Sequence, residues 1–283
     1  MRTALATVFA SILLAPSAAA AGDPEIAALQ VGLRTHGFYA GTVDGVLNAG
    51  TVQAVQRLQR KKGIAVDGVP GPKTRKALGR FGKRAPFGGR VLAAGSRGWD
   101  VAALQFALAW HGFPSGFLDG VFGASTEQAL RLFQGWSGLR ADGLAGPAVI
   151  RALRGPLPTC PIPLSSPMPG PYGDLFGPRG NRFHSGIDYP AGRGAPVGAA
   201  ASGVVTYAGW AAGGWGRLVT VAHASGVQTM YAHLSRVAVR VGQRVATGQL
   251  VGRAGASGEA SGPHLHFEVR VGGAAVDPLS RLL

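Results

Sequence analysis

The chain has 283 residues, of which 46 are glycine and one is cysteine, and its formal net charge is +15. This length favours two or three domains, and the glycine content favours a loop-rich protein that contains β structure. A single cysteine excludes an internal disulfide, a zinc–cysteine cluster and a CxxC redox site. The excess of basic residues predicts contact with anionic polymers, and because no nucleic-acid-binding motif is present, we expect polymers other than nucleic acid.

Residues 1–21, MRTALATVFASILLAPSAAAA, have the pattern of a secretory signal peptide. Arg2 gives a positive start, a short apolar run follows, and small residues then supply a cleavage site. The apolar run is too short to span a bilayer comfortably, so we expect no stable membrane insertion. After cleavage the protein is expected to be secreted, either to the periplasm or to the cell wall. No feature of the sequence predicts an oligomeric state.

An internal repeat with a period of 75 residues follows. Residues 25–78 align without a gap with residues 100–153, and 24 of these 54 positions are identical. Such similarity indicates a duplicated module. The predicted boundaries are 22–82 for module 1 and 98–154 for module 2, with a linker at 83–97 that is rich in Gly, Pro and Arg.

Each module is predicted to fold as a small bundle of three short helices. The first helix has apolar residues at helical spacing and ends at a His-Gly pair, where glycine suits a C-cap. The second helix is predicted to begin at Thr51 or Thr126, which are good N-cap types. Pro72 and Pro147 fall in the first turn of the third helix, where the missing N–H has no cost. His36 and His111, the histidines of the His-Gly pairs, are interpreted as structural residues.

Both copies resemble the peptidoglycan-binding repeat of many cell-wall hydrolases. The resemblance is carried by DGVFGASTEQALRLFQ and ADGLAGP in the second copy and by DGVPGPKTRKAL in the first. The first copy departs from the family pattern, with Leu47-Asn48 in place of Phe-Gly and Leu58 in place of Phe. The resemblance implies attachment to the wall, with weaker binding by the first copy, and no chemistry.

The composition changes after residue 154. A Pro-rich linker is predicted at 155–166, and it contains Cys160, for which a free thiol and a bond to a second chain are both open. From 167 to 283, Val-rich runs alternate with glycine turns at 203–209, 217–223, 227–234, 249–255 and 264–271, which is typical of a compact antiparallel β domain. The predicted fold class is therefore multidomain, with two small all-α three-helix modules followed by a mainly antiparallel all-β domain.

Five of the seven histidines lie in this last domain. His184 and Asp188 are four apart in HSGID, where Gly186 favours an extended segment or a turn over a helix, and His264 and His266 share one face of a predicted strand. Two imidazoles and a carboxylate are a suitable ligand set for Zn²⁺, with water in the fourth position. The two patterns together, in one small domain, predict a metal site.

These residues give four candidate ligands, one more than a site with an open position requires. One histidine should therefore stay outside the coordination sphere and move protons, and His233 in MYAHLS is a further candidate for that task. Since the sequence has no HExxH motif, we expect a histidine as the general base. Spacing alone leaves open whether His264 or His266 is the ligand.

The C-terminal domain resembles the lysostaphin-type, or LytM-like, zinc metallopeptidases over about residues 167–280. The segments that carry the resemblance are FGPRGNRFHSGIDYPAGRGAPVGAAASGVV, MYAHLS and SGPHLHFEVR. It implies a zinc endopeptidase that cuts peptide cross-links or bridges of peptidoglycan, with one zinc ion per chain. It also implies His184, Asp188 and His266 as metal ligands and His264 and His233 as the catalytic pair. His264 is then the expected base, and His233 is expected to steady the oxyanion or to protonate the leaving amine.

Other polar residues near these motifs have both structural and functional interpretations. Glu268 is predicted on the strand face of His266 and Tyr231 on that of His233, where each could orient a ring or simply pack. Arg179 and Asn181, upstream of the HSGID segment, could line a substrate groove. His223, before a glycine turn, is interpreted as structural.

Two other functions are alternatives to the endopeptidase. One is a catalytically silent wall-binding activator of another hydrolase, which has no physical need for an intact His/Asp set. The other is a glycan-cleaving lysozyme, which needs paired carboxylates that the C-terminal domain does not evidently offer.

Overall fold

The computed structural model describes residues 21–82 and 87–283. The predicted signal segment 1–21 thus lies, except for its last residue, outside the described residues, as does part of the linker predicted at 83–97. The described residues form six α-helices: α1 Pro24–Thr35, α2 Ala49–Lys61, α3 Pro72–Ala77, α4 Trp99–Trp110, α5 Ala124–Trp136 and α6 Pro147–Ala152. None of the helices in these ranges is both long and apolar enough to span a membrane.

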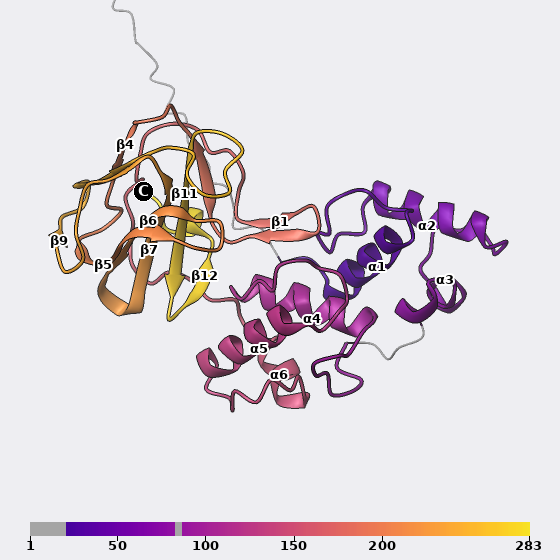
Figure 1. Cartoon of the computed structure of the whole chain (residues 1–283). Helices are drawn as coiled ribbons and strands as arrows, with labels where there is room; N and C mark the ends of the chain where they lie inside the picture. The colour runs from indigo at the N-terminus through magenta and orange to yellow at the C-terminus, as the bar shows by residue number, and fades with distance from the viewer. Residues whose placement is uncertain (1–20, 83–86) are drawn as a thin grey trace, which may run out of the picture.

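Twelve strands lie within residues 177–276, and three single 3-10 turns complete the described elements. The strands are β1 Gly177–Arg179, β2 Arg182–His184, β3 Ile187–Pro190, β4 Pro196–Gly198, β5 Gly203–Ala211, β6 Gly216–Ala222, β7 Val227–Leu234, β8 Arg236–Val237, β9 Arg244–Val245, β10 Leu250–Arg253, β11 His264–Val271 and β12 Ala274–Val276. The predicted order of two helical modules and one antiparallel β domain is therefore confirmed (Figure 1).

The first and third helices of each module follow the sequence prediction. α1 and α4 end at His36 and His111, whose Nε2 atoms lie 3.1 and 3.0 Å from the carbonyl oxygens of Leu78 and Leu153. These equivalent bonds join the end of the first helix to the end of the third, so both histidines are structural, as predicted. Prolines stand at the start of α3 and α6, also as predicted.

The second helices begin earlier than predicted. Asn48 caps α2 by accepting a hydrogen bond from Thr51 N, and Gly123 precedes α5, so neither Thr51 nor Thr126 is an N-cap. Both threonines are buried instead and accept a hydrogen bond at 3.1 Å from a buried glutamine of the first helix, Gln30 or Gln105. The prediction was wrong because each threonine satisfies this internal glutamine, a contact that local sequence does not reveal.

The two modules pack directly on each other. α1 lies against α4, and one hydrophobic cluster contains Leu29 of α1, Leu58 of α2 and Phe106 of α4. The helical half of the chain is therefore one block with a shared core, although its sequence is a tandem repeat.

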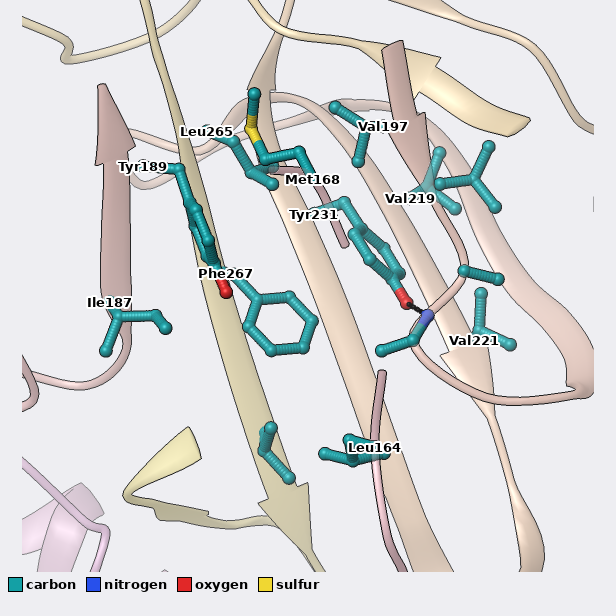
Figure 2. Packing of buried hydrophobic residues seen from close by; sticks show 14 of the residues in the cluster. Leu164, Met168, Ile187, Tyr189, Val197, Val219, Val221, Tyr231, Leu265 and Phe267 are labelled. Carbon is teal, nitrogen blue, oxygen red and sulfur yellow. Dashed lines mark hydrogen bonds between the residues drawn. The ribbon is translucent and has the colours of Figure 1, made fainter. Parts of the chain in front are cut away.

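The β domain contains a seven-stranded antiparallel sheet in which β11 pairs with β3, β7 and β12. β11 spans the predicted run 264–271. Its odd-numbered residues Leu265, Phe267 and Val269 are buried in the hydrophobic core. Figure 2 shows Phe267 in that core beside Tyr231 of β7. The even-numbered residues of β11 point to the opposite face and carry its histidines.

The Pro-rich stretch predicted as a linker at 155–166 packs against the β domain. Cys160 and Leu164 are buried in the same hydrophobic cluster as the sheet, and Leu164 N donates to Arg281 O near the C-terminus. Cys160 is free and fully buried, and burial raises the pKa of its thiol. A bond from Cys160 to a second chain does not fit this burial.

The hairpin formed by β1 and β2 reaches out of the β domain to the helical block (Figure 1). Val43 N of module 1 donates to Gly180 O at 2.8 Å, and Leu118 N of module 2 donates to Asn181 O at 2.8 Å. Val43 and Leu118 are equivalent under the 75-residue shift, so each repeat uses the same amide to hold the hairpin tip. Phe183 of β2 also packs edge-on against Trp110, with ring centroids 5.3 Å apart.

Candidate metal centre

His184, Asp188 and His266 come together on the face of the sheet opposite the hydrophobic core. His184 ends β2, Asp188 lies on β3, and the β3–β11 register places Asp188 directly opposite His266. Asp188 Oδ1 lies 3.2 Å from His184 Nε2 and 2.8 Å from His266 Nδ1, and the two ring nitrogens are 2.9 Å apart. Of the two ligand choices that spacing left open, His266 is thus the one that meets the carboxylate closely.

Gly186 makes this meeting possible. A Cβ at that position would lie 2.3 Å from Phe267 O, so only glycine lets the segment between β2 and β3 approach β11 so closely. Gly186 forms a bend between the two strands and not a helix, which agrees with the predicted choice of an extended segment or a turn.

The other nitrogen of each ligand-candidate ring already has a partner. His184 Nδ1 lies 2.9 Å from Leu175 O, so this nitrogen can keep its proton when a metal displaces the one that Nε2 donates to Asp188, and Nε2 then offers a lone pair. His266 Nε2 lies 3.2 Å from the carboxylate of Glu268, which leaves His266 Nδ1 to face the cluster. These outer partners orient both rings toward one point, as in known metal sites.

The electrostatics of the cluster favour a positive charge among its three atoms. Burial acts to raise the pKa of Asp188, but hydrogen bonds from His184 and His266 outweigh burial and hold this pKa well below its usual range. Burial acts to lower the pKa of His266, but its bonds to Asp188 and Glu268 raise it to about 9. The cluster therefore holds a proton tightly, and a divalent cation that displaced this proton would place a larger positive charge at the same point.

Glu268 is the functional residue that sequence reasoning left undecided. It is fully buried, bonds Ser185 Oγ, and pairs with Arg270 Nε at 2.8 Å. Burial acts to raise the pKa of Glu268, but the bond from His266 and the charge of Arg270 lower it to about 2. Glu268 is therefore a buried carboxylate that orients His266. The sequence signal for this role was its even-numbered position on β11, which places it on the same strand face as His266.

His233 reaches the same face by a break in the strand pattern. Its φ is +57°, and the β6–β7 register shifts so that Ala232 and His233 together lie opposite Leu218, which is a β-bulge. The predicted shared face of Tyr231 and His233 was therefore wrong. Tyr231 is buried in the core and its hydroxyl accepts a bond from Ala200 N (Figure 2).

The rings of His233 and His264 lie beside the cluster, with their centroids 4.7 Å apart. His233 Nδ1 lies 2.8 Å from Ser257 O, and His264 Nδ1 lies 2.9 Å from Gly262 O. Each Nδ1 therefore donates to a carbonyl and each Nε2 is left with a lone pair. His264 Nε2 is 3.8 Å from Asp188 Oδ1, so it stands next to the cluster without joining it.

A hollow of about 300 Å³ opens on these side chains, and its lining includes Asp174, Arg179, Asp188, His233, His264 and His266. Arg179 Nη1 pairs with Asp174 at 2.6 Å and lies 3.4 Å from Asp188 Oδ2, so Arg179 lines this hollow. Asn181 lies instead at the hairpin tip against module 2. His223 bonds Ser202 O and Thr229 away from the site, in agreement with its structural interpretation.

Residues 182–278 match the family described as "Peptidase family M23". These residues form a domain of peptidase family M23. Residues 22–78 and 97–153 match the family described as "Putative peptidoglycan binding domain". The M23 domain therefore contains the whole His/Asp cluster, and the two repeats are domains of the peptidoglycan-binding family.

Several curated proteins are similar to part of this chain. It is 48% identical over 99 residues to the DD-carboxypeptidase/endopeptidase Mpg of Neisseria meningitidis serogroup B, a match that covers 35% of this chain and 23% of the relative. It is 40% identical over 97 residues to the peptidoglycan DD-endopeptidase ShyC of Vibrio cholerae, which covers 34% of this chain and 22% of the relative. The chain thus spans less than a quarter of the length of these relatives.

Among solved structures, the chain is similar to the catalytic domain of the antimicrobial peptidase lysostaphin from Staphylococcus simulans. The identity is 33%, the match covers 39% of this chain and 90% of the other, and the TM-score is 0.37. That score supports no conclusion about this chain.

Proposed function

We propose that this protein is an exported, zinc-dependent endopeptidase that hydrolyses peptide cross-links or bridges of bacterial peptidoglycan and is held to the wall by its two repeats. The observation that carries the proposal is the convergence of His184 Nε2, Asp188 Oδ1 and His266 Nδ1 beside two further histidine rings.

The donor set suits zinc. Two imidazole nitrogens and one carboxylate oxygen, each turned inward by an outer partner, are the ligands of many catalytic zinc sites. Bound by His184, Asp188 and His266, zinc would supply a Lewis acid that activates water and polarises the scissile carbonyl.

His264 and His233 are assigned the proton transfers. The Nδ1–H of each ring is held by a carbonyl, so each ring offers Nε2 to the substrate side of the cluster. His264 takes a proton from the attacking water at Nε2. Burial lowers the pKa of His233, which keeps that ring neutral near pH 7. The proton that His264 takes must finally reach the leaving amine, and His233 delivers it, or donates to the oxyanion, once its own Nε2 has received that proton.

The proposed substrate and location follow from the rest of the chain. Two domains of the peptidoglycan-binding family precede the M23 domain, and the Neisseria and Vibrio relatives are named as endopeptidases. The net charge of +15 suits the anionic polymers of the wall, and the segment 1–21 supports export. The domain boundaries at 22–82, 98–154 and 167–283 belong to this proposal.

The test is digestion of purified peptidoglycan by residues 22–283, with and without a chelator, with the released fragments identified by mass spectrometry. We expect zinc-dependent loss of cross-linked dimers while the glycan strands stay intact. Release of shortened glycan strands would contradict the peptidase assignment, and the masses of the released peptides would identify the bond that is cut.

Two variants test the assigned roles. His264→Ala and His233→Ala should each lower the rate of release by about a hundredfold or more, since removing a general acid–base group costs 10²- to 10⁴-fold. Both should keep their zinc and their wall binding, whereas His36→Gln, a control in module 1, should keep full activity. A zinc-loaded wild-type chain that binds wall but releases nothing would favour the silent activator.

A further inference from the structure

A second and larger hollow lies where module 2 meets the M23 domain. Its volume is about 960 Å³, which is in the range of ligand pockets, and pockets often form at domain interfaces. Helix α5 and the loop after α4 form one wall, and the M23 domain forms the other with Trp215 and Arg270. We call this hollow the interdomain groove.

The interdomain groove lies next to the metal centre, with two side chains between them. Trp215 lines the groove, and its ring centroid is 5.6 Å from that of His266. Arg270 also lines the groove and holds the carboxylate of Glu268, which contacts His266 on its other side. The groove is therefore one side chain away from a metal-ligand candidate, close enough for one long polymer to contact both sites.

The two repeats differ at the positions that form this groove. On the groove side of α5, module 2 has Leu132, Gly135 and Trp136. At the equivalent positions, 75 residues earlier, module 1 has Arg57, Arg60 and Lys61. Long charged side chains are thus replaced in module 2 by small or apolar ones, which opens the hollow and gives it an aromatic surface.

Ser115 supplies an independent sign of a ligand. It lines the groove, is only 6% exposed, and its hydroxyl has no hydrogen-bond partner in the protein. Module 1 has Ala40 at the equivalent position. A buried hydroxyl normally has a partner. The oxygen of Ser115 has almost no accessible surface, so a ligand in the groove would bond it once the side chain turns toward the groove.

The lining also indicates the chemistry of the ligand. Its two charged side chains are Arg131 and Arg270, each paired on one side with a carboxylate, of Glu127 and Glu268 respectively. Trp136 is fixed at the groove by donating Nε1–H to Val271 O of the M23 domain at 3.2 Å. Aromatic faces and arginines together suit a ligand that has sugar rings and carboxylates.

We propose that the interdomain groove is a substrate subsite that takes one disaccharide–peptide unit of peptidoglycan, with its sugars against Trp136 and its acidic peptide toward Arg270. This rests on the proposed function for the identity of the polymer. Binding in the groove is nevertheless measured without cleavage, so the two proposals fail separately.

The test uses residues 22–283 loaded with zinc and a soluble disaccharide–tetrapeptide prepared from peptidoglycan, with binding followed by calorimetry. Leu132→Glu places a negative charge in the groove at a side chain that is 56% exposed, so the fold is not expected to change. Leu144→Glu makes the same change at a residue of module 2 that is 46% exposed and does not line the groove. We expect binding to weaken about tenfold in Leu132→Glu, because a charged side chain then replaces an apolar one beside Trp136, one helical turn away, where the sugars lie. Binding should stay at the wild-type value in Leu144→Glu.

A second variant and a second readout complete the test. Ser115→Ala should weaken binding by about two- to tenfold, as expected for loss of one hydrogen bond. With cross-linked disaccharide–peptide dimers as substrate, Leu132→Glu should raise KM and leave kcat unchanged, and it should not affect a cross-linked peptide that lacks sugars. Equal effects of Leu132→Glu and Leu144→Glu, equal effects on both substrates, or no binding by the wild type would overturn the subsite. Binding with the predicted pattern in a chain that cuts nothing would support the subsite and refute the endopeptidase.

Discussion

The contact between module 2 and the M23 domain can be tested with a pair of equivalent glycines. Gly37 and Gly112 follow the first helix of their modules and have φ values of +76° and +87°. A Cβ at Gly37 would meet no atom within 4 Å, whereas a Cβ at Gly112 would lie 2.4 Å from Ala275 O and 2.5 Å from Ala275 N in β12. Ala275 N donates to Gly112 O at 3.1 Å, so an alanine at 112 breaks this contact.

The expected magnitudes follow from that geometry. Both Gly37→Ala and Gly112→Ala place an L-residue in the left-handed region, at a cost of about 1–2 kcal/mol. Gly112→Ala must also separate α4 from β12 and leave the buried groups of a broken hydrogen bond without partners, which adds about 1–3 kcal/mol. Gly37→Ala has only the cost of the left-handed backbone. The additional loss of stability in Gly112→Ala therefore measures the contact between module 2 and the M23 domain.

Amide hydrogen exchange at Ala275 reports the loss of the Gly112–Ala275 contact directly. Since 1.4 kcal/mol corresponds to a factor of ten, we expect exchange at Ala275 to be roughly 5- to 150-fold faster in Gly112→Ala than in Gly37→Ala. Denaturant unfolding should also give the lower free energy for Gly112→Ala. Equal exchange rates in the two variants would refute the reasoning, because module 2 would then not contact the M23 domain in solution.

Four further outcomes are expected. His266→Ala should reduce bound zinc from one ion per chain to almost none, measured by elemental analysis of the dialysed protein. Glu268→Gln should keep the zinc site but weaken its zinc affinity by about 10–100-fold, because His266 loses its charged partner. A chelator competition measures this affinity, and an unchanged value would mean that Glu268 has only a packing role. Tyr231→Phe should lower stability by about 1–3 kcal/mol, since Ala200 N loses its acceptor, and should leave zinc affinity unchanged. Burial lowers the pKa of His111, so the unfolded chain takes up a proton before the folded one. The contribution of His111 to stability should therefore fall as the pH drops below about 6.5, by at most about 1.4 kcal/mol per pH unit. Denaturant unfolding at a series of pH values should show a steeper loss of stability in the wild type than in His111→Gln.

Much of the fold could be predicted because its signals are local. The strict alternation of HLHFEVRV fixes β11 and places His264, His266 and Glu268 on one face. Pro72 and Pro147 mark the third helices, and Gly186 marks the extended turn between two predicted ligands.

What could not be predicted depends on contacts between distant segments. The bulge that turns His233 to the site arises from a register shift against β6, and the alternation of β7 gives no sign of it. The choice of His266 over His264 depends on the register of β3, which spacing does not determine. The packing of residues 155–166 on the sheet was hidden because a Pro-rich segment is typical of a linker.

The hairpin held at its tip by Val43 and Leu118 has a consequence for exchanging parts of this protein. A tandem repeat joined to a peptidase suggests modules that recombination or protein engineering could exchange freely. Here, however, the strand that ends at His184 belongs to a hairpin, and both modules hold the tip of that hairpin. A foreign wall-binding domain spliced onto residue 167 would leave that hairpin, and the ligand it carries, without its support. The helical block is therefore part of the scaffold of the metal centre, and a functional chimera would need to replace the helical block and the hairpin together.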